Sequence, residues 1–289
     1  MYQITGKTKL LGIIGDPVEH SLSPIMHNTV ISELEMDYIY VPFTVTQKHL
    51  NSALIGLANI GVVGFNVTIP HKETILPLLF KATKVSQLIG AVNTVWYTDE
   101  GWYGTNTDVV GILASLKPLN YNWSNTKPII LGYGGAAKAA MVALAELGCT
   151  EIIIVGRNYD RLKNFRERWS ASELFDCINI YRFSELPKIL DKTQLLINAT
   201  PIGMYPNINH SPIAKEILKQ LPNTAIIYDL IYTPSSTILL QDAANLGLAT
   251  INGSKMLVHQ GAAALGLWLQ KEVPIDLMYR SLMNYLQKN

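Results

Sequence analysis

The sequence PIILGYGGAAKAAMVALAELG, residues 128–148, joins a short apolar run to a glycine-rich turn and a long alanine-rich segment. Gly132, Gly134 and Ala137 give the pattern GxGxxA. The first glycine permits a tight turn, the second lets the backbone approach a pyrophosphate at the helix N-terminus, and the alanine allows close helix packing. A glycine-rich turn without a ligand is the alternative, but the strand, turn and helix together favour a dinucleotide site. The candidate cofactor-binding residues of the turn are Gly132, Gly134, Gly135, Ala136 and Ala137.

The segment IIIVGRNYDR, residues 152–161, favours NADP over NAD as the cofactor. In this type of domain the second strand ends in an acid that bonds the ribose 2′-hydroxyl, or in arginine that accommodates a 2′-phosphate. Here Arg157 follows the apolar run and Arg161 lies one helical turn further on, so two guanidinium groups can bind the phosphate. Asn158 is a further candidate between them. The competing interpretations are a role for nearby Asp160 and two arginines that are merely solvated.

The first part of the chain alternates between short apolar runs and amphipathic segments. Strands are predicted at 10–15, 38–45 and 62–69, because short continuous apolar runs are typical of strands covered on both faces. Helices are predicted between them, at 23–37 and 50–61. This alternation indicates an α/β fold with a mostly parallel sheet.

Turn and cap signals refine this prediction. Ser23 is an N-cap candidate, with Pro24 at the first helical position. Residues 74–90 predict a helical region interrupted near Pro77, and a hairpin is expected around 99–101. The second part of the chain, beyond the glycine-rich turn, contains three more apolar runs with turn signals at their ends, at 195–200, 225–232 and 248–253.

The composition is typical of a globular protein and favours a small molecule as its partner. Of the 289 residues, 48% are hydrophobic and 16% are charged, with a formal charge of +1. Lys and Arg are scattered, so the charge pattern of a nucleic-acid or membrane-surface binder is missing. No apolar stretch approaches the roughly 20 residues of a membrane span. Cys149 and Cys177 fit no disulfide framework and no histidine pair has metal-ligand spacing, so we expect a cytoplasmic protein without a metal.

Eight short motifs occur in an order and spacing that resemble one enzyme family. They are HSLSP (20–24), NVTIPHK (66–72), GAVNTV (90–95), GTNTD (104–108), GYGGAAK (132–138), NATPIGM (198–204), YDLIY (228–232) and MLVHQGAAAL (256–265). Together they resemble the shikimate dehydrogenases, from about Leu11 to Leu269. Because the motifs are independent of one another, their agreement is a specific signal.

The resemblance implies the reversible NADPH-dependent reduction of 3-dehydroshikimate to shikimate, a step of aromatic amino-acid biosynthesis. It also implies that Lys72 and Asp108 form the catalytic pair. The cofactor moves a hydride and the protein must move a proton, which a positioned lysine can do. Asp108 stands where a helix is expected to begin, and the helix N-terminus stabilises a carboxylate. Either member can be the proton donor, and a structural salt bridge is the alternative interpretation of the pair.

The same resemblance implies the other site residues. Substrate-binding residues would be Ser21, Ser23, Asn66, Thr68, Asn93, Tyr232 and Gln260, with the two serines on the substrate carboxylate. Residues near the nicotinamide riboside would be Asn198, Ala199, Thr200, Met204 and Gly253. The alternatives for Ser23 and Thr68 are an N-cap and an ordinary turn residue. A homodimer is compatible with the family.

The resemblance further implies two domains. Residues 1–107 plus 253–289 would form an N-terminal α/β substrate-binding catalytic domain, and residues 108–252 a Rossmann-type NADP-binding domain. The chain departs from the family pattern at Lys255 and at Gly156, where many relatives carry asparagine. Two alternatives remain: a quinate/shikimate dehydrogenase that uses NAD or NADP, and a catalytically silent nucleotide-binding paralogue.

Overall fold

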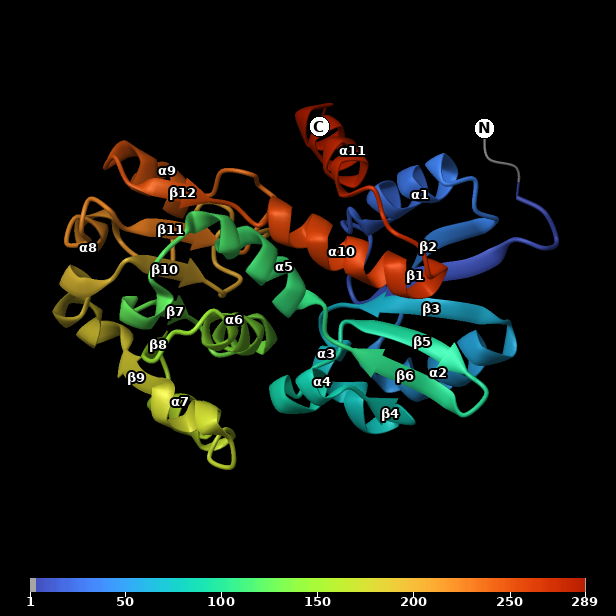
Figure 1. Ribbon diagram of the computed structural model, residues 1–289, viewed down its shortest axis with the longest axis horizontal. Coiled ribbons are helices and arrows are strands. Elements are labelled where there is room, and N and C mark those ends of the chain that lie inside the picture. The colour runs from blue at the N-terminus through green and yellow to red at the C-terminus, as the bar shows by residue number, and fades with distance from the viewer. Residues whose placement is uncertain (1–3, 289) are drawn as a thin grey trace. The chain divides into compact units, whose positions relative to one another are not determined.

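The computed structural model describes residues 4–288, which fold into two compact units (Figure 1). The first unit runs to Val110 and resumes at Val258, and the second spans Gly111–Leu257. Each unit contains one sheet with helices packed on it. The predicted α/β fold with two domains is therefore confirmed.

The first unit is built on a mixed six-stranded sheet. In sheet order β2-β1-β3-β5-β6-β4, the neighbours β1 and β2, β1 and β3, and β4 and β6 are parallel, and the hairpin strands β5 and β6 run antiparallel. The strand bounds are β1 (Lys9–Gly15), β2 (Tyr38–Thr44), β3 (Val62–Val67), β4 (Lys81–Ala82), β5 (Thr94–Thr98) and β6 (Gly101–Thr105). The carboxyl ends of β1 and β3 therefore meet at one edge of the sheet, where loops that carry chemistry usually lie.

Helices pack on this sheet, and its strands β1 and β3 are buried over most of their length. The helices that lie wholly in the first unit are α1 (Ser23–Glu33), α2 (Leu50–Asn59), α3 (His71–Thr74), α4 (Lys84–Ile89) and α11 (Ile275–Lys288). Helices α5 (Asp108–Leu116) and α10 (Ser254–Leu269) each have residues in both units. Helices α1 and α11 lie side by side (Figure 1), and the hydroxyls of Thr29 and Ser281 are 2.8 Å apart. The last helix of the chain is thereby attached to the first unit.

One glycine is required where α10 meets the sheet. The indole Nε1 of Trp268 donates to the Val95 carbonyl at 2.9 Å, and the indole edge lies close to Gly64 of the neighbouring strand β3. A Cβ on Gly64 would collide with this ring and with the Val95 carbonyl. Because Gly64 has no side chain, the indole has room to donate a hydrogen bond to this buried carbonyl.

Two local predictions for this unit are wrong. Ser23 is the first residue of α1 rather than its cap; Leu22 holds the cap position, and no side chain bonds there. Ser23 is buried, which leaves its hydroxyl for tertiary contacts. The predicted helical region 74–90 was expected to be interrupted near Pro77, but Pro77 lies inside the short helical turn Leu76–Leu78, and the break comes at the two-residue strand β4, which pairs with β6.

The second unit is a fully parallel sheet of six strands in the order β12-β11-β10-β7-β8-β9. The bounds are β7 (Ile129–Leu131), β8 (Ile152–Gly156), β9 (Ile178–Arg182), β10 (Leu195–Asn198), β11 (Ile226–Asp229) and β12 (Ala249–Ile251), with helices α6 (Gly135–Glu146), α7 (Tyr159–Glu167), α8 (Lys215–Leu218) and α9 (Ile238–Asn245). Read along the chain this is the strand order of a Rossmann domain, whose topological reversal lies between β7 and β10. The Rossmann-type prediction is confirmed.

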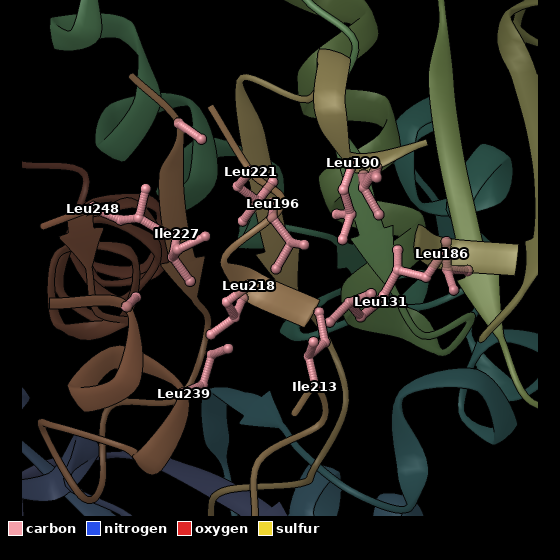
Figure 2. Packing of buried hydrophobic residues seen from close by; sticks show 14 of the residues in the cluster. Leu131, Leu186, Leu190, Leu196, Ile213, Leu218, Leu221, Ile227, Leu239 and Leu248 are labelled. Atoms are coloured by element: carbon pink, nitrogen blue, oxygen red, sulfur yellow. The ribbon is translucent and has the colours of Figure 1, made fainter. Parts of the chain in front are cut away.

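The core of the second unit lies on the face of the sheet covered by α8 and α9. Figure 2 shows its leucine and isoleucine side chains, including Leu131, Leu196, Leu218, Ile227 and Leu239, packed together between these elements. All five are wholly buried. Interiors of this kind are close-packed, so they hold the strand ends, and the loops that follow them, in fixed positions.

Strand β9 was missed by the sequence analysis. Its residues, INIYR, contain two polar side chains, and only Ile178 is buried, because β9 is an edge strand of the sheet. A search for continuous apolar runs does not find such a strand. Among the described residues, no helix is both long and apolar enough to span a membrane.

Candidate active site

Lys72 and Asp108 form an ion pair at the carboxyl edge of the first sheet. Lys72 lies in the single turn α3, just after β3, and Asp108 is the first residue of α5. Lys72 Nζ donates to Asp108 Oδ2 at 2.7 Å. The lysine side chain is 26% exposed and the carboxylate side chain 6%, so the lysine is partly exposed while the carboxylate is held inside. A partly exposed pair can meet a ligand, which a wholly buried salt bridge cannot.

The amide of Asn93 fixes the second oxygen of that carboxylate. Asn93 Nδ2 donates to Asp108 Oδ1 at 2.8 Å and to Gln260 Oε1 at 3.3 Å. Its Oδ1 accepts from the Thr107 amide (2.8 Å), the Thr107 hydroxyl (3.1 Å) and the Thr94 hydroxyl (2.9 Å). Since the amide oxygen is surrounded by donors, Nδ2 has to face Asp108. The weak 3.3 Å bond is the one that a ligand hydroxyl can replace.

A second asparagine is oriented by a buried aromatic pair. Asn66 Nδ2 donates to the Asn93 carbonyl (3.0 Å) and to the Thr94 hydroxyl (3.2 Å), and its Oδ1 accepts from the Tyr40 hydroxyl at 2.7 Å. The Tyr40 ring stacks on His27, with centroids 4.2 Å apart. Burial raises the pKa of Tyr40, so its hydroxyl stays a donor. With both amide hydrogens occupied, Asn66 can offer a ligand only its oxygen.

The remaining predicted substrate residues of the first unit lie around this network. Ser23 is buried next to Tyr40 and hydrogen-bonds with it, and the Ser21 hydroxyl accepts from the Ser23 backbone amide at 3.3 Å. Thr68 follows β3 and packs its methyl group against Gly15. The structure therefore joins Lys72, Asp108, Asn93, Gln260, Asn66 and Ser23 through contacts within one unit. No bond of Thr68 to this network is present among the described residues.

The glycine-rich turn of the second unit has the predicted geometry. Gly132 has a φ of +104°, a backbone conformation that residues other than glycine rarely adopt. It lies against Ala199 and Thr200. Gly134 occupies the N-cap position of α6, and nothing lies within 4 Å of where its Cβ would be. Open backbone at a helix N-terminus suits a pyrophosphate. Ala137 is wholly buried, which is consistent with close packing of α6 on the sheet.

The arginines that were predicted to bind a 2′-phosphate follow β8 and remain exposed. Arg157 and Arg161 are exposed, and neither makes an ion pair in the described part of the chain. Asn158 is the N-cap of α7, where its Oδ1 accepts from the Arg161 amide at 3.0 Å. Two free guanidinium groups near a helix N-terminus can accept a phosphate.

The residues that were predicted near the nicotinamide follow β10 and β11. Asn198 is wholly buried, and its side chain holds the backbone of the loop that carries Ala199 and Thr200. Met204, further along this loop, is 38% exposed. The Gly253 amide donates to the carbonyl of Ile231 at 3.0 Å. Ile231 directly precedes Tyr232. Burial raises the pKa of the Tyr232 hydroxyl.

Three residues of the first-unit network were not predicted: Tyr40, Thr94 and Thr107. The two threonines follow asparagines in the motifs GAVNTV and GTNTD, so the repeated Asn-Thr dipeptide was a usable signal. Tyr40 lies in an apolar strand and gives no local signal, because its partner Asn66 is 26 residues away.

Within residues 4–288, no group of three or more His, Cys, Asp or Glu side chains could hold a metal ion.

A Rossmann unit with an open glycine turn, on a chain whose other unit pairs a buried carboxylate with a partly exposed lysine, is typical of dinucleotide-dependent dehydrogenases. Three family models match the sequence: the shikimate dehydrogenase substrate binding domain at residues 13–95, shikimate / quinate 5-dehydrogenase at 114–230, and the shikimate 5′-dehydrogenase C-terminal domain at 253–283. The chain belongs to the shikimate dehydrogenase family.

Known relatives are similar over almost the whole chain. A protein of Gloeothece citriformis named shikimate dehydrogenase (NADP(+)) is 53% identical over 283 residues, 98% of each chain. A crystal structure of a shikimate dehydrogenase in complex with NADP+ is 38% identical, with a TM-score of 0.90 and 98% of both chains covered. The structure of shikimate 5-dehydrogenase from Listeria monocytogenes, in complex with shikimate and NAD, is 34% identical, with a TM-score of 0.86, and covers 98% of this chain and 99% of that one.

Proposed function

We propose that this protein catalyses the reversible NADPH-dependent reduction of 3-dehydroshikimate to shikimate, as a step of aromatic amino-acid biosynthesis. The observation that carries the proposal is the 2.7 Å pair between Lys72 Nζ and Asp108 Oδ2, in which the lysine side chain is partly exposed and the carboxylate is buried. Family membership supports the reaction, since the relatives named above are shikimate dehydrogenases.

The chain's own residues would manage the proton. Reduction adds a hydride to the ketone carbon and a proton to the ketone oxygen; NADPH, when bound, supplies the hydride. Lys72 and Asp108 would both lie within reach of that oxygen, and the pair would deliver the proton in reduction and accept it in oxidation. Asn93, which bonds Asp108 at 2.8 Å, would keep the carboxylate in place during the transfer.

Substrate recognition would rest on neutral donors and acceptors. Ser21 and Ser23 would hydrogen-bond the carboxylate of the substrate. Asn66 would accept from a ring hydroxyl, since both its amide hydrogens are occupied. The remaining ring contacts are proposed for Thr68, Asn93, Tyr232 and Gln260.

NADP is the proposed cofactor, and residues 108–252 its proposed domain. Gly132, Gly134, Gly135, Ala136 and Ala137 would hold the pyrophosphate at the N-terminus of α6, where the backbone is open. Arg157, Asn158 and Arg161 would bind the adenosine ribose and its 2′-phosphate. Asn198, Ala199, Thr200, Met204 and Gly253 are proposed for the nicotinamide end. Residues 1–107 plus 253–289 would bind the substrate.

One assay tests the function. Purified protein is mixed with shikimate or quinate and with NADP or NAD, and formation of the reduced cofactor is followed by absorbance. We expect shikimate with NADP to give the highest kcat/KM of the four combinations. Turnover of quinate with NAD at a comparable rate would instead identify a quinate/shikimate dehydrogenase. Folded protein that gives no signal in any combination would contradict the enzymatic proposal and favour a silent nucleotide-binding protein.

We further propose a cytoplasmic location and a homodimeric state. Two free cysteines, Cys149 and Cys177, are consistent with a reducing compartment. Cell fractionation and light scattering of the purified protein test the two statements separately.

A further inference from the structure

Asp229 carries a buried carboxylate to which the proposed chemistry gives no part. It ends β11 and is wholly buried. Within residues 4–288 its hydrogen-bond partners are neutral: Asn198 Nδ2 (3.0 Å) and the Ile231 amide (3.1 Å) donate to Oδ1, and the Thr237 hydroxyl (2.7 Å) donates to Oδ2. Burial raises the pKa of Asp229 to about 6, although these bonds oppose the shift. Burying a carboxylate without a cation is costly, so its retention calls for a function.

The Asn198 amide extends the influence of this carboxylate into the loop after β10. Its Nδ2 donates to Asp229 and to the Ile202 carbonyl (3.2 Å), and its Oδ1 accepts from the amide (3.0 Å) and the hydroxyl (2.7 Å) of Thr200. Both amide hydrogens are therefore engaged with the protein, and the oxygen already has two donors. The Asn198 side chain can orient residues 199–202, but it has no free hydrogen for a cofactor.

The segments proposed for the nicotinamide end all rest on this arrangement. Gly203, with a φ of +110°, lies against Ile231 and Thr237, 3.3 and 3.4 Å from where its Cβ would be. The Gly253 amide donates to the Ile231 carbonyl at 3.0 Å. On the other side, the backbone oxygen of Ala199 lies 3.1 Å from where a Cβ on Gly132 would be. The glycine turn and the loops after β10 and β11 thus share one support.

We propose that Asp229 is a positioning residue that holds these loops in the geometry needed by the nicotinamide half of NADP. Its carboxylate is the only group that accepts from the last residue of β10, the loop after β11 and the N-cap of α9 together, as far as the described residues show. It does not touch the cofactor, because it is wholly buried. The inference rests on the proposed use of NADP.

A cofactor fragment separates positioning from a general effect on the fold. Adenosine 2′,5′-bisphosphate carries the adenosine and 2′-phosphate of NADP but lacks the nicotinamide riboside. For Asp229→Ala, without substrate present, we expect the Kd of NADP to rise by at least about tenfold, the loss of more than one hydrogen bond. The Kd of the bisphosphate should stay within about twofold of the parent value. Calorimetry measures both.

Two further variants keep the test decisive if Asp229→Ala does not fold. Asp229→Asn retains an oxygen that can accept from Asn198 and Ile231, and its new Nδ2 can donate to Thr237, so NADP binding should return to within about threefold of the parent. Thr237→Val removes one of the three bonds and should weaken NADP by about three- to tenfold. Thr237→Ser keeps the hydroxyl and is its matched control, with binding unchanged.

Equal weakening of NADP and the bisphosphate in Asp229→Ala and Thr237→Val would overturn the positioning role, because the whole unit would then be affected. Unchanged NADP binding in both variants would overturn it too. A parent protein that binds NADP but does not oxidise shikimate would remove the proposed reaction and leave this test valid. A parent that binds neither NADP nor the bisphosphate would overturn both proposals.

Discussion

Asp108 in the first unit and Asp229 in the second are two buried carboxylates at the carboxyl edges of two sheets, and both are bound by the side-chain amide of an asparagine. Asn93 donates to Asp108 at 2.8 Å and Asn198 donates to Asp229 at 3.0 Å. They differ in their other partner. Asp108 meets the ammonium of a lysine whose side chain is 26% exposed, whereas the described partners of Asp229 are neutral and Asp229 is wholly buried.

The difference shows what a buried carboxylate needs in order to act on a ligand. A partly exposed lysine gives Asp108 a charged partner that can take part in proton transfer to a substrate oxygen. Neutral donors from three segments give Asp229 a fixed position and no route outward. A buried carboxylate bound by an asparagine amide can therefore take part in a reaction in one unit and fix the geometry of loops in the other.

Removing the ammonium should have the largest effect. We expect Lys72→Ala to lower kcat for shikimate oxidation by about 10²- to 10⁴-fold, the usual contribution of general acid–base catalysis, with the fold retained. Steady-state kinetics with saturating NADP, together with circular dichroism, measure this. Lys84→Ala, at an exposed lysine of the same unit, is the control. Activity of Lys72→Ala within about tenfold of the parent would refute the catalytic role.

In the second unit the predicted phosphate-binding groups are the exposed arginines Arg157 and Arg161, so charge removal there should affect cofactor choice. We expect Arg157→Gln to raise the KM of NADP by about 10- to 100-fold, because a charge-assisted bond to the 2′-phosphate is lost. The KM of NAD, which lacks this phosphate, should change little. Arg168→Gln, at an exposed arginine after α7, is the control. A lower KM for NAD than for NADP in the parent would contradict the phosphate assignment.

His27 is a third kind of buried titratable group, a neutral ring without a polar partner among the described residues. Burial lowers its pKa from 6.5 to about 3. Between pH 6.5 and 3 this histidine is protonated in the unfolded chain but not in the folded chain. The free energy of unfolding therefore falls as the pH drops through that window. We expect this group to cost about 2 kcal/mol at pH 5 relative to pH 7.

Urea unfolding at several pH values measures this cost. His27→Phe keeps a ring to stack on Tyr40 and should flatten the dependence on pH below 6.5, even if its absolute stability differs. His49→Phe, at an exposed histidine, should keep the slope of the parent. Parallel pH curves for the parent and His27→Phe would show that the His27 ring takes up its proton as easily in the folded protein as in the unfolded chain.

The smallest effect is expected at Thr107, which acts on Asp108 only through Asn93. Thr107→Val removes one of three bonds to the Asn93 oxygen, at 3.1 Å, and should lower kcat by about three- to tenfold with little change in the KM of NADP. Thr107→Ser keeps the hydroxyl and should restore kcat. If valine and serine behave alike, the hydroxyl has no part in orienting Asn93.

The sequence predicted those features that depend on neighbours along the chain. The GxGxxA turn predicted the Rossmann unit because each of its residues has a local backbone task. The interleaved apolar runs predicted most strands, but not the edge strand β9, whose sequence INIYR contains no continuous apolar run. Ser23 has the local pattern of a cap, and its burial against Tyr40 depends on contacts that the pattern does not contain.

In the candidate site, too, the sequence predicted residues that lie in local motifs but not the contacts between distant segments. Lys72 and Asp108 were predicted from motifs, but their 2.7 Å contact joins residues 36 apart and required the fold. Asp229 stood inside the motif YDLIY without a role, because its partners Asn198 and Thr237 come from other segments. Residues that touch a ligand tend to fall in motifs, whereas residues that hold them are identified by their contacts.

The most direct test of the contrast replaces each carboxylate by its amide and compares kcat for shikimate with NADP. We expect Asp108→Asn to lower kcat by about 10²-fold or more, because the charged partner of Lys72 is lost, while NADP binds as in the parent. Asp229→Asn should keep kcat within about threefold, since the amide can still hold the loops. Comparable kcat values for the two variants would contradict the assignment of chemistry to one carboxylate and of positioning to the other.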